Sequence, residues 1–242
     1  MMNLWKAEWL KLKHSKLILL AIALPMFAVI QGKFFTSATL EGVKDPVYEI
    51  YFIGSMVLFS WLVYPLLAAI VIVMIARVEH SGDGWKQLLA LPVSRTSVYC
   101  VKFFISMGIL LFSLVVLYIG IWIGGATFPQ AGAFPAFDLF KQLVKYFVAS
   151  FPMISVLFFF SYRFQHTGIP LGIGIGLSLP AIMIGQSERF WIYYPWSYPM
   201  TSALADPADL GIKATIMYGL SIGMLVTLFF VGLARFRLKD II

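Results

Sequence analysis

Long apolar runs separated by short polar segments dominate the chain. Six runs have the length and composition of membrane-spanning helices, or nearly so, because such a helix needs about 20 mostly apolar residues. They cover residues 17–35, 50–76, 103–126, 143–162, 169–185 and 214–234. The second run is long enough to tilt or to break near Pro65, and the fifth is short and bracketed by Pro170 and Pro180.

Helices are the structure that these runs predict. The ten-residue alternation of barrel strands is absent, and backbone amides in lipid must find partners within the segment, so helices remain. The first run follows several lysines and resembles a secretory signal peptide, but no small-residue cleavage site and soluble domain come after it. We therefore expect an uncleaved first helix and an all-α integral membrane protein, with one transmembrane domain over residues 1–242.

Composition supports the same class. Hydrophobic residues make up 61% of the chain and charged residues 12%, whereas a soluble domain carries about 25% charged residues. A soluble core is therefore disfavoured. The single cysteine, Cys100, excludes an intrachain disulfide and any multi-cysteine metal site.

The basic residues predict an orientation. With the N-terminus in the cytoplasm, twelve of the 18 Lys and Arg residues fall in cytoplasmic segments. This asymmetry predicts that both termini are cytoplasmic. The net charge of +7 is then a signal of topology. Because the basic residues do not form one face of a soluble module, we do not expect nucleic-acid binding.

The spans carry little chemistry of their own. Their only ionisable residues are Lys33 and Lys145, both near predicted outer ends, where they can reach the headgroups. This disfavours a proton- or sodium-coupled carrier. Phosphate-cradling, zinc-protease and serine-hydrolase motifs are absent, so we expect no enzyme and no cofactor or metal in this chain. Glycines recur at spacing four, as in Gly120/Gly124, Gly168/Gly172/Gly176 and Gly219/Gly223, which permits close helix packing.

The segment between the second and third runs is polar and lies on the predicted cytoplasmic side. Asp83 can cap a short helix over residues 85–91, Pro92 interrupts that helix, and Ser94 can cap a second helix that leads into the third run. The short helix presents Trp85, Leu88 and Leu89 on one face.

Two interpretations of this segment stay open on physical grounds. It is either a connector lying on lipid or a docking surface for a cytoplasmic partner. In the second case Trp85 and the two leucines fill a pocket, while Glu79, Lys86 and Arg95 fix the register.

Four features in this order resemble the first cytoplasmic loop of ABC-2 type permeases, the membrane subunits of ABC transporters. They are Glu79, the helix over residues 85–91, the turn Pro92-Val-Ser-Arg95 and Lys102. The N-terminal helix expected at residues 2–15 has Trp5, Trp9 and Leu12 on one side and is similar to the interfacial helix of that family. The resemblance implies six spans with both ends inside, and a coupling helix between spans two and three.

The aromatic segment Trp191-Ile-Tyr-Tyr-Pro-Trp-Ser-Tyr-Pro199 is similar to a signature of the lantibiotic-immunity and bacitracin-resistance permeases. Aromatic residues also collect at lipid headgroups in general, so an interfacial role stays open. The alternative is an extracytoplasmic gate or peptide-binding surface. Its candidate residues are Phe128, Phe134, Trp191, Tyr194, Trp196 and Tyr198.

The resemblance implies a permease subunit of an ATP-driven exporter in the bacterial cytoplasmic membrane. Its expected partners are two ABC ATPase subunits, which hold ATP and Mg²⁺, a second permease chain, membrane lipid and an amphiphilic peptide. Removal of an antimicrobial peptide such as a lantibiotic, for self-immunity or antibiotic resistance, is the expected activity. A lipid or small hydrophobic drug as substrate, and a non-transporting scaffold or sensor subunit, are the alternatives.

Overall fold

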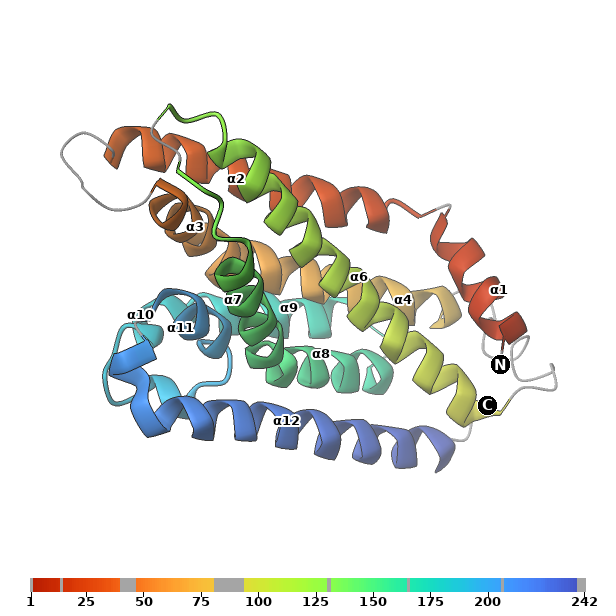
Figure 1. The fold of residues 1–242 in the computed structure, drawn as a ribbon. Coiled ribbons are helices and arrows are strands. Elements are labelled where there is room, and N and C mark those ends of the chain that lie inside the picture. The colour runs from red at the N-terminus through yellow and green to blue at the C-terminus, as the bar shows by residue number, and fades with distance from the viewer. Residues whose placement is uncertain are drawn as a thin grey trace.

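A computed structural model describes residues 2–13, 15–39, 47–80, 94–129, 132–164, 166–205 and 207–238. These residues form helices joined by turns, and no strand occurs among them (Figure 1). The elements are α1 (Met2–Lys13), α2 (Leu17–Thr39), α3 (Val47–Leu58), the π-helix η1 (Phe59–Val63), α4 (Tyr64–His80), α6 (Arg95–Gly125), α7 (Ala136–Ala149), α8 (Phe151–Arg163), α9 (Gly168–Ser178), α10 (Ala181–Gly185), the 3₁₀-helix η2 (Trp191–Tyr193), α11 (Tyr198–Leu204) and α12 (Pro207–Leu238).

Within the described ranges, five stretches are long and apolar enough to cross a membrane. They are Leu17–Thr39, Val47–Arg77, Arg95–Gly125, Ala136–Arg163 and Leu210–Leu238. Each contains or overlaps one of the predicted runs, so the all-helical membrane architecture is confirmed. The third stretch starts earlier than predicted because the polar first turns at Arg95 continue directly into the apolar run.

The fifth predicted run is not confirmed as a span, so the count of six spans is not confirmed. The run over residues 169–185 divides into α9, a shorter apolar helix, and the five-residue α10. Pro180 separates them, and proline has no N–H to donate to the preceding turn. Neither piece reaches the length of a spanning helix.

The break expected near Pro65 takes the form of a π-helix. The N–H of Tyr64 donates to the carbonyl of Phe59, five residues earlier, at the end of η1. Proline at position 65 removes the donor that Trp61 would otherwise use, and one wider turn accommodates that loss. A second break, at Ser150, separates α7 from α8 within the fourth stretch.

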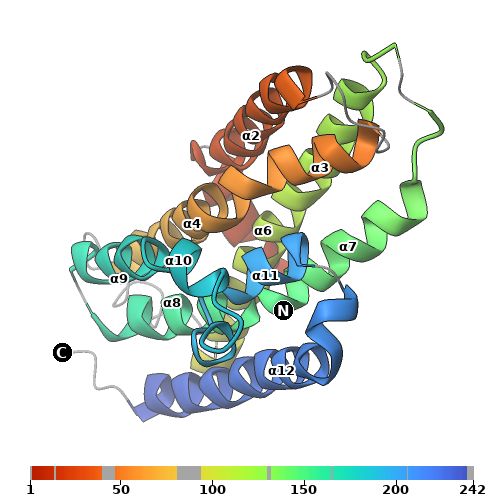
Figure 2. The ribbon, with the colours of Figure 1, turned by 90° about the vertical axis from the view of Figure 1, so that its left-hand side faces the viewer.

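The helices form a bundle with two distinct ends. Helices α2, α6, α8 and α12 run along it, while α7 and α11 pack together toward one end (Figures 1 and 2). That end also holds α10, and we call it the α11 end. At the opposite end, called the α1 end, lie α1, the start of α6 and the last turns of α4, α8 and α12 (Figure 1). The core contains fully buried tyrosines and phenylalanines, including Tyr64, Tyr146 and Phe59.

Candidate functional site

The residues expected to couple to a partner gather at the α1 end, as far as they are described. Arg95 begins α6, and Lys102 lies two turns further along it. Glu79 lies in the last turn of α4, and its side chain is not described. Trp85, Lys86, Leu88, Leu89 and Pro92 lie outside the described residues. The helix over residues 85–91 therefore stays a prediction.

The start of α6 has the cap that its sequence predicts. Ser94 has an extended backbone, and its hydroxyl accepts a hydrogen bond from the N–H of Ser97 at 3.1 Å. This satisfies one of the amides that a helix leaves unpaired in its first turn. The second helix expected after Pro92 is thus present, and it is continuous with the third span.

Two arginines fasten the start of α6 to the end of α12. Arg95 donates from Nη1 to the carbonyl of Arg237 at 3.0 Å, and Arg237 donates from Nε to Thr96 Oγ1 at 2.8 Å. The residues lie more than 140 positions apart in sequence. We call this pair of hydrogen bonds the arginine clamp. The clamp therefore joins the first turn of α6 directly to the last turn of α12.

Lys102 forms a buried ion pair with the N-terminal helix. Its Nζ donates to Glu8 Oε2 at 2.7 Å, and the side chains are 1% and 6% exposed. Glu8 also accepts a hydrogen bond from Lys11 at 2.9 Å. Burial alone raises the pKa of Glu8, but the charges and hydrogen bonds of Lys102 and Lys11 outweigh it and lower that pKa. The Glu8 carboxyl is therefore ionised at neutral pH.

The ion pair reveals which face of α1 meets the bundle. Leu4 and Glu8, four residues apart, are buried, whereas Trp5 and Trp9 are exposed. The side chain of Leu12, the third member of the predicted apolar face, is not described. Outward-facing tryptophans on such a helix suit the membrane interface, as the sequence predicted. Glu8 itself was missed, although it is the only acidic residue among the first sixteen.

The six aromatic candidates at the α11 end are packed into the protein rather than displayed on its surface. Phe128, Trp191, Trp196 and Tyr198 are buried, and Phe134 and Tyr194 are half-buried. The Tyr194 hydroxyl donates to the carbonyl of Leu177 at 2.5 Å, and the Tyr198 hydroxyl to that of Ile192 at 2.6 Å. These bonds hold the segment in place. A peptide-binding role for these residues would thus require them to move, and it stays a prediction.

Other aromatic side chains are exposed near the same end. Phe137, Phe190 and Tyr193 have more than half of their surface accessible. The sequence placed Phe137 on an aromatic outer surface with Phe128 and Phe134, but it did not point to Phe190 or Tyr193 as contact residues. The signal that could have found these two is their position: Phe190 directly precedes the buried Trp191, and Tyr193 directly precedes the half-buried Tyr194.

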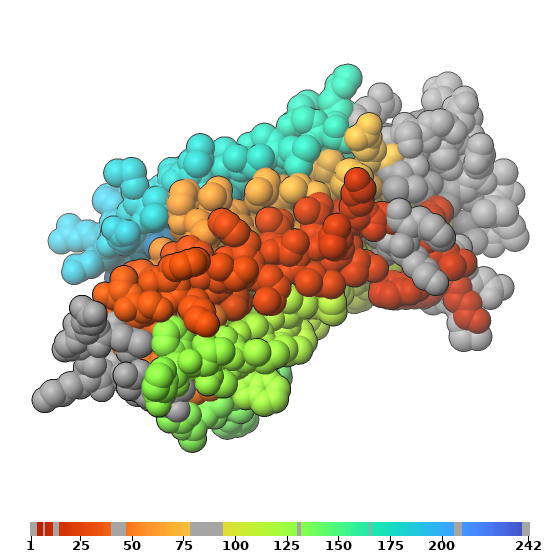
Figure 3. All heavy atoms as spheres, turned by 90° about the horizontal axis from the view of Figure 1, so that it is seen from above, coloured from red at the N-terminus to blue at the C-terminus, as the bar shows by residue number. Residues whose placement is uncertain are grey.

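Helices α2 and α6 lie side by side (Figure 3), and an apolar groove runs along the line where they meet. It has a volume of about 600 Å³, and Lys33 is the only charged residue among those described in its lining. Gly120 and Gly124 line it, and each already receives a neighbour from within the chain. Val29 packs on Gly120, and the Tyr51 hydroxyl lies on Gly124. The glycine spacing in this helix therefore serves packing within one chain.

Comparison with protein families decides the assignment. The model of the ABC-2 family transporter proteins matches residues 4–180, well over half of the 242 residues. The chain belongs to the ABC-2 transporter family. A search of curated proteins by sequence found no match.

As an ABC-2 permease, the protein is a multi-pass membrane protein and the membrane subunit of an ABC transporter, which associates with ABC ATPase partners. The matched region includes Glu8, residues 79–95 and Lys102, so the ion pair and the predicted coupling segment both belong to the family domain. The aromatic segment 191–199 lies beyond it. The narrower resemblance to lantibiotic-immunity permeases therefore gains no support from this match.

Proposed function

We propose that this ABC-2 permease is the membrane half of an exporter in which ATPase subunits drive transport by acting on residues 79–95. The observation that supports this most directly is the fastening of α6 at the α1 end. Immediately after the proposed contact segment, the arginine clamp joins α6 to α12 and the Glu8–Lys102 pair joins it to α1. A force applied at residue 95 therefore reaches three helices.

The energetics of this coupling constrain the contact. ATP can shift the permease between two arrangements only if the ATPases bind those arrangements with different affinities. The contact with residues 79–95 must then differ between the arrangements. A rigid start of α6 makes this effective, because movement of the segment is not absorbed by local bending.

The assembly we propose contains two ATPase subunits, which carry ATP and Mg²⁺, and two permease chains, identical or different. It lies in the bacterial cytoplasmic membrane with both termini and the α1 end in the cytoplasm. Gly219 and Gly223 on α12 have no neighbour of the described chain above them. A second membrane helix could approach closely there.

For the substrate, we propose an amphiphilic antimicrobial peptide such as a lantibiotic, taken from the membrane to give immunity or resistance. Its support is the similarity of residues 191–199 and the exposed aromatics Phe137, Phe190 and Tyr193 near them. Rigid aromatic surface binds amphiphilic ligands well.

A lipid or small hydrophobic drug is the second candidate, and the α2/α6 groove favours it. Its volume of about 600 Å³ falls within the roughly 300–1,000 Å³ of small-molecule sites. An apolar wall with a single lysine suits an acyl chain beside a polar headgroup.

Assays of ATP hydrolysis on two variants test the coupling. We expect Trp85→Ala and Glu79→Ala to insert normally but to lose substrate-stimulated ATP hydrolysis in the reconstituted transporter. Trp122→Ala is the matched control, since Trp122 is an exposed tryptophan of α6 at the α11 end. Full stimulation in both loop variants would refute the coupling role, and a permease that binds an ATPase without ever stimulating it would favour the scaffold alternative.

A further inference from the structure

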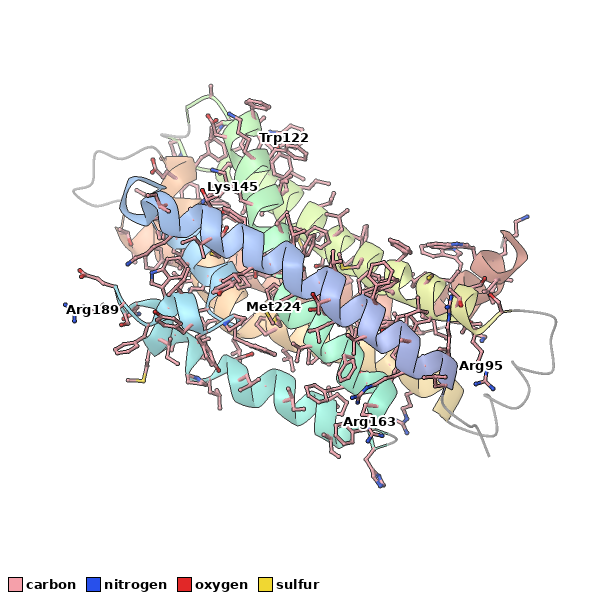
Figure 4. The ribbon with its side chains drawn as sticks, turned by 90° about the horizontal axis from the view of Figure 1, so that it is seen from below. Arg95, Trp122, Lys145, Arg163, Arg189 and Met224 are labelled. Carbon is pink, nitrogen blue, oxygen red and sulfur yellow. The ribbon has the colours of Figure 1, made fainter. Side chains whose placement is uncertain are left out.

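The α1 end contains a second polar feature that the coupling role does not use. A cavity of about 220 Å³ lies between α6, α8 and α12, and its lining includes Tyr99, Phe159, Tyr162, Arg163, Gly232 and Arg235. Figure 4 shows Arg163 and Arg95 at this end of the bundle, beside the last turns of α12, and Arg189 at the opposite end. We call this cavity the arginine pocket.

Two guanidinium groups border the arginine pocket. Arg163 is in the last turn of α8 and Arg235 in the last turn of α12, and both are exposed. Neither forms an ion pair with a carboxylate of the described residues. The guanidinium of Arg235 lies 5.8 Å from the ring centroid of Phe159, a cation–π contact that orients it. The border of the pocket therefore carries positive charge that no described acid neutralises.

The interior of the arginine pocket supplies a buried donor. Tyr99 is 1% exposed, and its hydroxyl has no hydrogen-bond partner in the described part of the chain. The hydroxyl lies on Gly232, where any side chain would collide with it. Edge contacts with Phe158 at 5.1 Å and Tyr162 at 5.6 Å fix the ring. A buried hydroxyl without a partner costs free energy unless a ligand or water satisfies it.

A phosphate group fits this combination. Arginine guanidiniums pair with phosphate through parallel N–H···O bonds, and a phenol hydroxyl can donate a further bond to the same anion. Helix C-termini also favour cations, which accounts for the arginines alone. That reading does not account for the cavity between them or for the unsatisfied Tyr99 hydroxyl.

The setting selects the kind of phosphate. The pocket lies at the end of membrane-spanning helices and is lined in part by the exposed Leu238, and further along α12, toward the α11 end, Val226 and Phe230 are exposed. A volume of about 220 Å³ is too small for a whole lipid but sufficient for a headgroup phosphate, with the acyl chains lying on this apolar surface. We propose that the arginine pocket binds the headgroup of an anionic glycerophospholipid, and that the bound lipid braces α6, α8 and α12 beside the arginine clamp.

Native mass spectrometry of the purified permease, without ATPase subunits, tests this independently of the proposed transport function. We expect one phosphatidylglycerol per chain to stay bound and to be preferred over phosphatidylcholine. The double variant Arg163→Gln/Arg235→Gln should bind it at least about tenfold more weakly, as expected for the loss of charged hydrogen bonds. The matched control, Arg189→Gln, removes one cation at the α11 end and should bind as the unmodified chain does.

Tyr99→Phe separates the pocket from general surface charge, because it keeps the ring and removes only the hydroxyl. We expect phosphatidylglycerol binding to fall several-fold while the elution volume on size exclusion stays unchanged. Equal binding of the two lipids, or equal loss in Arg189→Gln, would overturn the proposal. Tight binding of inorganic phosphate that competes with the lipid and loses strength in the same variants, without any lipid preference, would assign the pocket to a free anion instead.

Discussion

Removing the carboxylate of Glu8 should release α1 from the bundle. Glu8→Gln keeps the size of the side chain but leaves the Lys102 ammonium, 1% exposed, without the negative charge at 2.7 Å. Breaking a buried ion pair from one side costs about 3–5 kcal/mol. The buried Leu4 also anchors α1. We therefore expect the free energy of opening α1 to fall by most of this amount.

Limited trypsin digestion in nanodiscs measures that opening. Lys16 lies between α1 and α2 and is exposed, but cleavage needs several extended residues around it. When opening and closing are fast, the cleavage rate follows the open population, so about 3 kcal/mol corresponds to a roughly hundredfold faster cut. Cleavage at Arg189, at the α11 end (Figure 4), should not change.

The double variant Glu8→Leu/Lys102→Met separates charge from packing. Replacing both partners of a buried pair by apolar groups is often neutral or stabilising, so cleavage at Lys16 should return toward the rate of the unmodified chain. An unchanged rate in Glu8→Gln would refute the claim that the ion pair holds α1. A double variant as fast as the single one would show that packing, not charge, holds it.

Three further outcomes follow from the same contacts. Thr96→Val removes the acceptor of Arg237 and should destabilise the start of α6 by about 1 kcal/mol, seen as a lower thermal unfolding temperature, whereas Thr96→Ser keeps the hydroxyl acceptor and should not lower it in this way. Gly124→Ala meets the buried Tyr51 hydroxyl and should cost about 1–3 kcal/mol in the same assay, whereas Gly172→Ala, which meets nothing, should be neutral or stabilising. The pKa of Glu8 in the folded chain lies below its ordinary value of 4.5. The ion pair should therefore contribute its full stability above that value and lose it as the pH falls through the lowered pKa. A spectroscopic label attached to α1, which needs no protease, should report the release of α1 only in acid.

The apolar runs were well predicted because a helix that crosses the hydrocarbon layer must be long and apolar, whether a side chain faces lipid or another helix. Both properties can be read from each run by itself. The start of α6 was predictable for a similar reason, since the Ser94 cap is a local contact with the N–H of Ser97, three residues away. Pro180 illustrates the limit: it was noted as a bracket of the fifth run, yet its effect was to divide the run and leave both parts too short to span.

The Glu8–Lys102 pair could not be predicted in this way. The two residues are separated by 94 positions, and no periodicity joins them. Lys102 was assigned to a lever on the ATPase side from its place after the loop, whereas its described carboxylate partner is on α1. The aromatic segment is a comparable case. Its composition is that of an interfacial surface, but Tyr194 and Tyr198 turn inward to the carbonyls of Leu177 and Ile192, and a residue pattern does not reveal such acceptors.

The central claim is that an ATPase partner contacts residues 79–95 and moves α6 through them. The most direct measurement is photocrosslinking in intact cells from a benzoylphenylalanine placed at Trp85, with the same probe at Trp122 as control. The account predicts that position 85 captures an ABC ATPase subunit, that the yield changes when ATP hydrolysis is blocked, and that position 122 captures none. Absence of an ATPase at position 85, with the permease correctly inserted, would contradict it.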